Sequence, residues 1–222
     1  MFVMLSFTEE NYLKAVYHLS EGGQQPVLTN ALADALNTKP ASVTDMIKKL
    51  SIKKLITYEK YYGVTITKQG KADALSIIRK HRLWETFLVK KLNFEWDQVH
   101  EVAEQLEHIQ STLLIEKLDE FLGYPMVDPH GHPIPDKNGK LHADQQIPLG
   151  EVTGKKSSIV KAVKESASFL QYLSKIGVYI GAKIAILEKT EFDGSVEILI
   201  DGKKKVFISK EASQNILVAQ AQ

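Results

Sequence analysis

Two neighbouring stretches decide the fold: KPASVTDMIKKL at residues 39–50 and LITYEKYYG at residues 55–63. The first carries apolar residues at the i, i+3, i+4, i+7 spacing of one helical face, namely Val43, Met46, Ile47 and Leu50. Pro40 suits the first helical position, where its missing N–H costs nothing. The second stretch and residues 64–67 are rich in β-branched and aromatic residues and flank a turn at Gly63, which predicts a β-hairpin.

Helices are expected on both sides of these stretches. A helix from Thr8, as its N-cap, to Ser20 and a short helix capped by Thr29 come before them. Two short helices, a tight turn and a hairpin follow one another in the order of a winged helix-turn-helix. Further along the chain, apolar periodicity predicts helices from near Thr67 to about Leu92, from about Asp97 to Gln110 and from Ser111 or Thr112 to Leu122.

The rest of the chain changes character. Residues 124–148 hold five prolines and read as a linker. From Ile147 onward short strand-like runs appear, and Val196–Ile200 and Lys203–Ile208 flank the hairpin pair Asp201-Gly202. We therefore expect a mainly α fold with small β elements.

Three domains are predicted. They are a winged helix-turn-helix DNA-binding domain (residues 1–75), a helical metal-binding and dimerisation domain with a Pro-rich linker (76–146), and a small SH3-like β-barrel (147–222).

Composition narrows the class of protein. The 222 residues include no cysteine, which excludes disulfides, thiolate metal sites and thiol nucleophiles and fits a cytoplasmic protein. No apolar run is long enough to span a bilayer, and the apolar start Met1–Phe7 lacks the basic residues and cleavage site of a signal peptide. We expect no membrane partner.

Charge is unevenly distributed, although the net charge is only +1. Residues 39–71 hold eight lysines and two acids, a balance of 8 − 2 = +6. Residues 81–120 hold nine acids and four bases, a balance of 4 − 9 = −5 with histidines uncounted. A basic block followed by an acidic, histidine-bearing block points to polyanion binding and cation binding, although two solvated faces would look the same.

The helix at 39–50 has the features of a major-groove reader. Its apolar stripe faces the domain, and its other face offers hydroxyls and lysines. The hairpin adds a lysine and a tyrosine to the same surface. The predicted DNA-binding residues are Lys39, Ser42, Thr44, Lys48, Lys49, Lys60 and Tyr61.

Ligand-type residues recur at helical spacing in two later segments. His81 and Glu85 stand at i, i+4. A second set stands at i, i+4, i+7, i+8, on one face of a single predicted helix: His100, Glu104, Glu107 and His108. Imidazole and carboxylate without thiolate suit Mn²⁺ or Fe²⁺, and can also hold Zn²⁺ or Co²⁺. The loop histidines His130, His132 and His142 are not expected to be ligands.

Several segments together resemble the diphtheria-toxin-repressor family, and most closely its manganese-regulator branch. They are residues 39–63, HRLWE at 81–85, LEHIQS at 106–111, DPHGHPIP at 128–135, and a tail similar to the SH3-like, FeoA-type domain. The resemblance implies a homodimeric repressor, not an enzyme, that binds palindromic operators in double-stranded DNA when loaded with Mn²⁺ or Fe²⁺ and controls metal-uptake genes. It also implies one metal site from His81, Glu85 and His100, with a C-terminal carboxylate at Glu165. A second site would come from Glu104, Glu107, His108 and a first-helix residue.

The chain departs from the family pattern at four positions. Glu104 stands where the iron branch has cysteine, which is the manganese-branch choice. Asn11 replaces the methionine or aspartate of the first helix, and Lys14 stands where the manganese branch has a second carboxylate. Ser168 stands where the iron branch has glutamine. Asn11 offers only a neutral ligand, and Lys14 puts a close two-metal site in doubt. Glu9 and Glu10 are candidates to compensate, although the direction of the helix argues against them.

Three other readings stay open on the residues alone. A winged-helix regulator of another type would sense a small organic ligand and leave the His/Glu set incidental. A di-metal hydrolase would use the same set but leave the basic block unexplained. The C-terminal domain could also serve protein interaction instead of contributing Glu165.

Overall fold

The computed structural model describes residues 5–142, 145–153 and 157–220, which fall into two compact units. The first comprises the described residues of Met1–His81 with Leu106–Ser111 and Pro135–Lys140. The second comprises those of Arg82–Gln105, Thr112–Ile134 and Leu141–Gln222. Across the described residues, no helix is both long enough and apolar enough to cross a membrane.

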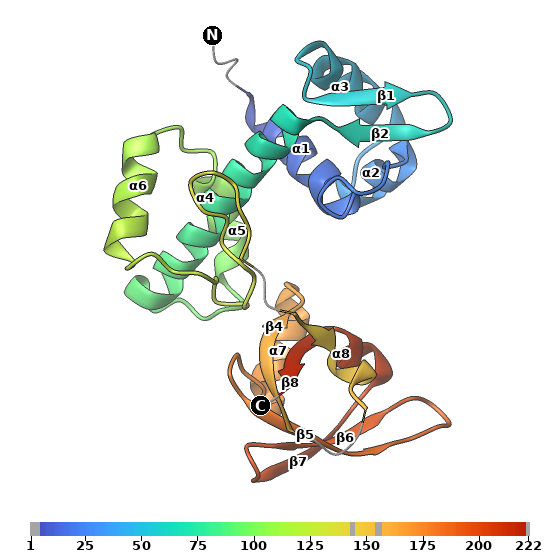
Figure 1. Cartoon of the computed structure of the whole chain (residues 1–222), viewed down its shortest axis with the longest axis vertical. Coiled ribbons are helices and arrows are strands. Elements are labelled where there is room, and N and C mark those ends of the chain that lie inside the picture. The colour runs from blue at the N-terminus through green and yellow to red at the C-terminus, as the bar shows by residue number, and fades with distance from the viewer. Residues whose placement is uncertain (1–4, 143–144, 154–156, 221–222) are drawn as a thin grey trace. The chain divides into compact units, whose positions relative to one another are not determined.

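The first unit begins with a winged helix-turn-helix, as predicted (Figure 1). Its elements are α1 (Phe7–Leu19), α2 (Thr29–Ala35), α3 (Pro40–Ile52), β1 (Ile56–Glu59) and β2 (Gly63–Ile66). The predicted apolar stripe of α3 faces the core, since Val43, Ile47 and Leu50 are buried. They join Leu13 of α1 and Leu32 of α2, both fully buried. Burial of this stripe leaves the polar face of α3 exposed.

The wing is held against the strand-like segment before α2. β1 and β2 pair antiparallel, and Val27 forms a bridge with Val64 through two backbone hydrogen bonds of 2.8 Å. Gly63 has φ +116°, and a Cβ there would lie 2.6 Å from the Val27 carbonyl oxygen. The wing therefore requires glycine at this position.

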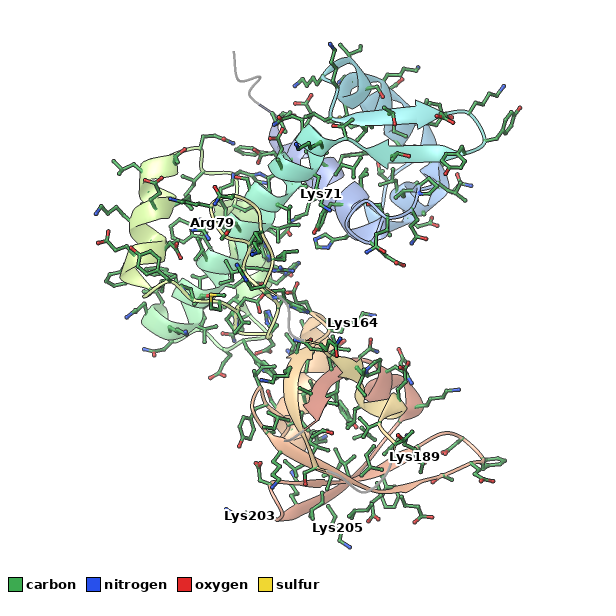
Figure 2. The ribbon with its side chains drawn as sticks, in the orientation of Figure 1. Lys71, Arg79, Lys164, Lys189, Lys203 and Lys205 are labelled. Atoms are coloured by element: carbon green, nitrogen blue, oxygen red, sulfur yellow. The ribbon has the colours of Figure 1, made fainter. Side chains whose placement is uncertain are left out.

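The long helix α4 (Lys68–Leu92) starts where it was predicted, because the Thr67 hydroxyl accepts a hydrogen bond from the Gly70 N–H. Its first part belongs to the first unit. Lys71 and Arg79 project from this part (Figure 2) and donate to the carbonyls of Gly22 and Pro135, each at 2.7 Å. These two bonds attach α4 to the winged domain and to residues 135–140.

The second unit combines helices with a six-stranded antiparallel sheet (Figure 1). Its helices are the end of α4, α5 (Val99–Leu106, except its last residue), α6 (Thr112–Phe121), α7 (Ala167–Ile176) and α8 (Lys210–Gln214), with a 3₁₀ turn at Leu149–Glu151. The sheet order is β3-β8-β4-β5-β6-β7. The strands are β3 (Ile147–Pro148), β4 (Ser157–Val163), β5 (Lys183–Lys189), β6 (Val196–Ile200), β7 (Lys204–Ile208) and β8 (Ile216–Gln220).

The sheet encloses a core of branched aliphatic residues. Val160, Ile184 and Ile198 are fully buried on neighbouring strands, and Leu173 of α7 covers them. The turn between β6 and β7 has positive φ at both Asp201 (49°) and Gly202 (69°), as the predicted hairpin requires. The expected mainly α fold with an SH3-like C-terminal sheet is confirmed.

The loop at 126–134 is pinned to β4 through backbone groups. The Val163 N–H donates to the His130 carbonyl at 3.0 Å. Gly131 has φ +88°, and a Cβ on it would lie 1.8 Å from the Lys161 carbonyl oxygen. This approach permits no side chain at residue 131, so the position of His130 depends on a glycine.

Three predicted helix limits are wrong. The N-cap of α1 is Ser6, which forms a capping box with Glu9, instead of Thr8. Thr29 is the first residue of α2 and caps nothing with its side chain. α5 ends at Leu106 and does not reach Gln110, so the ligand-type residues after Leu106 lie in a turn and not on the helical face.

We expect Gly131→Ala to destabilise the protein far more than Gly202→Ala. Both glycines have positive φ, so each alanine pays about 1 kcal/mol of backbone strain. Only Gly131 also meets a backbone oxygen, whereas nothing lies within 4 Å of a Cβ at Gly202. Thermal unfolding measures the melting temperatures of the two variants. Equal decreases in melting temperature would show that the contact of residue 131 with β4 is unimportant.

Candidate metal centre

Three predicted ligands come together in the second unit. Glu85 of α4 is fully buried, and its Oε1 lies 3.6 Å from His100 Nδ1. His100 Nδ1 also lies 3.9 Å from Oε2 of Glu165, in the loop between β4 and α7. The C-terminal domain therefore supplies a carboxylate to the cluster.

His130 lies in the middle of this cluster and is 0% exposed. Its Nε2 is 2.7 Å from the carbonyl oxygen of Trp96, which can only accept a hydrogen bond, so Nε2 carries a proton. Nδ1 faces the other way, 3.7 Å from Glu85 Oε2 and 3.7 Å from Glu165 Oε1. The backbone carbonyl thus orients the ring as outer-shell partners orient metal-binding histidines.

Asp128 and His132 complete the cluster. Asp128 Oδ1 accepts hydrogen bonds from the N–H groups of His130 and His132, which fixes the turn of the loop. Asp128 Oδ2 lies 3.6 Å from His132 Nδ1 and 3.4 Å from Arg82 Nε. His132 Nδ1 lies 2.7 Å from Glu165 Oε1, without the alignment of a hydrogen bond.

The cluster carries excess negative charge. Three carboxylates, those of Glu85, Asp128 and Glu165, face a single permanent cation, Arg82. Burial alone would lower the pKa of His130, but Glu165 and Glu85 outweigh it and raise the pKa to about 11. In the same way burial lowers the pKa of His132, and Asp128 and Glu165 together raise it to about 9.

A divalent cation fits this donor set. Asp128, His130, His132 and Glu165 each offer a ligand atom, and all four atoms lie within 4.8 Å of one another. Asp128 Oδ2 and the Nδ1 atoms of both histidines are buried and make no well-aligned hydrogen bond. Buried polar atoms that converge in this way call for a shared positive partner.

A cavity of about 480 Å³ leads to the same residues. His100, His130 and Glu165 line it together with two further acids, Asp97 and Glu101. An acidic wall raises the local concentration of cations, so the cavity suits the entry of a metal ion.

The first unit holds the ligand-type residues that follow α5. Glu107 is fully buried, and its Oε2 lies 2.6 Å from Nδ1 of His81 in α4. Lys14 Nζ of α1 donates to both Glu107 oxygens, at 2.7 and 2.9 Å. Burial raises the pKa of Glu107, but the hydrogen bond with His81 and the charge of Lys14 outweigh this and lower it.

His108 is attached to α1 as well. Its Nδ1 lies 2.5 Å from Glu10 Oε2, and Phe7 stacks on the ring with centroids 4.4 Å apart. The other Glu10 oxygen accepts a hydrogen bond from Gln110 at 2.8 Å. Glu9, by contrast, pairs with Lys53 at 2.6 Å. Of the two acids considered as substitutes for Asn11, only Glu10 reaches a predicted ligand.

The remaining predicted ligands lie apart from these contacts. Asn11 Oδ1 is buried and makes no hydrogen bond. Glu104 lies on α5 in the second unit, where its Oε1 is 3.8 Å from His100 Nε2. The predicted set is therefore distributed over both units and does not follow one helical face.

The predicted DNA-binding side chains are exposed on α3, at its N-cap and on the wing: Lys39, Ser42, Thr44, Lys48, Lys49, Lys60 and Tyr61. Tyr61, at the tip of the wing, is 90% exposed with φ +68°. The Thr44 hydroxyl donates to the Pro40 carbonyl and keeps its oxygen as an acceptor.

Sequence reasoning missed three residues of the second-unit cluster: Asp128, His130 and His132. The structure places both histidines there, whereas His142 is exposed. Their spacing was the available signal, because an aspartate at i that accepts from the N–H groups of i+2 and i+4 turns residues 128, 130 and 132 toward one side.

Three family models match the chain. An iron-dependent repressor N-terminal DNA-binding domain matches residues 4–64, and an iron-dependent repressor metal-binding and dimerisation domain matches residues 67–136. A FeoA domain matches residues 147–220. Together these matches cover most of the chain.

The chain is also similar in sequence to individual proteins. An uncharacterized HTH-type transcriptional regulator of Methanocaldococcus jannaschii is 36% identical over 118 residues, covering 53% of this chain and 94% of that protein. The iron-dependent repressor IdeR of Mycobacterium leprae is 27% identical, covering 95% of this chain and 96% of IdeR.

Solved structures are similar over the full length. A manganese-dependent transcriptional repressor in complex with manganese superposes with a TM-score of 0.89 at 32% identity, covering 96% of this chain and all of that one. The manganese regulator SloR gives a TM-score of 0.78 at 34% identity, covering 96% of this chain and 98% of SloR. The chain belongs to the iron-dependent repressor family of metal-dependent transcriptional repressors.

Proposed function

We propose that the protein is a cytoplasmic homodimer that binds palindromic operator DNA when loaded with Mn²⁺ or Fe²⁺ and so represses metal-uptake genes. Zn²⁺ and Co²⁺ share enough ligand chemistry to bind in vitro. The predicted domain limits at residues 75/76 and 146/147 are part of this proposal.

One observation carries the proposal: ionic contacts and hydrogen bonds join α1 to residues 107–110, a segment that holds two of the predicted metal ligands. Glu10 contacts His108 and Gln110, and Lys14 contacts Glu107, all within the first unit. α1 also packs in the core beneath α3. This packing supports the proposal that a change at residues 107–110 would reach the helix proposed to read DNA.

The surface of α3 and the wing fits DNA. Its lysines neutralise phosphates, and Ser42 and Thr44 offer short hydroxyls that reach base edges. In a homodimer two such helices must lie about one DNA turn apart, roughly 34–36 Å, to read a palindrome. This surface accounts for the basic block between residues 39 and 71.

In the second unit the metal would be held by Glu85, His100 and Glu165 together with Asp128, His130 and His132. When bound, it would supply the positive charge that these buried carboxylates need. The residues themselves orient the site: the Trp96 carbonyl fixes the His130 ring, and Asp128 fixes the loop. Glu104 extends the proposed ligand set of this unit, and His81 is proposed as a ligand in the first unit, beside Glu107.

We expect operator affinity to depend on metal. Fluorescence-anisotropy titrations with Mn²⁺, Fe²⁺, and EDTA should show at least about tenfold tighter operator binding with metal, because metal selects the competent arrangement. By linkage, operator DNA must tighten metal binding by the same factor. Equal affinity with metal and chelator would contradict the proposal, and metal counting on purified protein separates it from a regulator that senses an organic ligand.

Lys49→Ala should weaken binding to all DNA sequences alike. Removal of one phosphate contact makes the slope of log K against log salt shallower by about one. Lys175→Ala, which removes an exposed lysine from α7, serves as the matched control and should leave both quantities unchanged. An unchanged salt slope for Lys49→Ala would remove this residue from the interface.

Mn²⁺ binding should release protons. The raised pKa values of His130 (about 11) and His132 (about 9) keep both rings charged at pH 7, and only a neutral imidazole coordinates metal. The dissociation constant should therefore fall as pH rises from 7 to 9, by up to about tenfold per pH unit for each proton released. Calorimetry in buffers of different ionisation enthalpy counts these protons, and His132→Gln should release one fewer. A dissociation constant that does not change with pH would contradict this reading of the cluster.

A further inference from the structure

The carboxylate of Glu107 already has a cation. Lys14 Nζ lies 2.7 and 2.9 Å from its two oxygens, and the Lys14 side chain is only 14% exposed. Because Lys14 contacts both oxygens of this fully buried glutamate, its ammonium stands where a metal ion bound to Glu107 would lie. The predicted metal ligand is thus paired inside the first unit.

The surrounding charges are also nearly balanced. The acids Glu10 and Glu107 face the lysines Lys14 and Lys80 and the histidines His81 and His108. Lys80 is buried, which lowers its pKa, while the charges of Glu10 and Glu107 partly offset this effect. This balance contrasts with the second-unit cluster, where three carboxylates face one permanent cation.

A divalent cation at Glu107 therefore meets a like charge. The ammonium of Lys14 lies in contact with the oxygens that the metal would use, and like charges at such distances repel strongly in a buried setting. Asn11, the neighbouring α1 residue, brings no charge to compensate. For metal to bind Glu107 tightly, Lys14 must leave.

We propose that Lys14 competes with metal for Glu107 and so sets the metal concentration at which the first unit responds. Without metal, Lys14 keeps α1 attached to residue 107. The inference rests on the proposed metal-dependent function and specifies its regulation, because the chain carries its own competitor for one ligand.

The test is Mn²⁺ binding to Lys14→Met, which keeps the length of the side chain and removes its charge. Isothermal titration in the absence of DNA should give a dissociation constant about tenfold lower than the wild type at one class of site, or one more Mn²⁺ per subunit. In a Glu107→Gln background, Lys14→Met should no longer increase the affinity or the number of bound Mn²⁺ ions. A double-mutant cycle requires this result when the two residues act together.

Lys53→Met is the matched control. Lys53 also holds a glutamate of α1 through both oxygens, at 2.6 and 2.8 Å from Glu9, and it contacts none of the predicted ligands. It should leave Mn²⁺ affinity unchanged. Metal-free Lys14→Met should melt at a lower temperature than the wild type, because buried Glu107 loses its ammonium partner and keeps only His81, and Mn²⁺ should raise its melting temperature by more.

A second measurement uses the wild-type protein, in case Lys14→Met does not fold. The ¹⁵N resonance of the Lys14 ammonium should shift when diamagnetic Zn²⁺ is added, because the metal displaces it from Glu107. Mn²⁺ binding that is no tighter in Lys14→Met, an equal gain in Lys53→Met, or an unmoved Lys14 resonance at saturating Zn²⁺ would each overturn the proposal. Since no DNA is present, failure of operator recognition would leave these results unaffected.

Discussion

Buried carboxylates need positive charge close by, and the two units meet this need in different ways. In the first unit, Lys14 and His81 contact Glu107, so the charge is balanced by the chain itself. In the second unit, the three carboxylates of Glu85, Asp128 and Glu165 face one permanently charged partner, Arg82. The remaining positive charge comes from protonation of His130 and His132, whose pKa values are raised. A divalent ion can take over from protons in the second unit, whereas in the first it must displace a lysine.

Helix α5 ends early, and this ending makes the first arrangement possible. Had the helix continued past Leu106, Glu107 and His108 would have stayed on the face shared with His100 and Glu104. Instead they lie in a turn, where Glu107 reaches His81 and Lys14 and His108 reaches Glu10. One short segment therefore gives two short ionic contacts to α1, which packs beneath the surface proposed to read DNA.

Much of this architecture could be predicted from the sequence, because its signals are local. The periodicity around Val43 and Leu50, the glycine of the wing and the Asp201-Gly202 pair each specify an element without long-range information. The end of α5 could not be predicted, since Ile109 and Gln110 continue an apolar and polar pattern that a helix would tolerate. The spacing of residues 128, 130 and 132 was a local signal, but the contacts of His130 with Trp96 and Glu165 could not be predicted, because these residues are distant in sequence. The contact between Lys14 and Glu107 joins residues 93 positions apart, and no periodicity in the sequence signals it.

The close approach of Gly131 to β4 has a consequence for how such chains can vary in length. Because the histidine loop rests directly on the backbone of Lys161, the last domain forms one wall of the ion cluster and also donates Glu165 to it. A chain ending before residue 147 would lose the wall and the donor at once. A shortened version of this architecture would have to hold the proposed cation with donors that precede residue 147, so gain or loss of the tail would change ion binding as well as size.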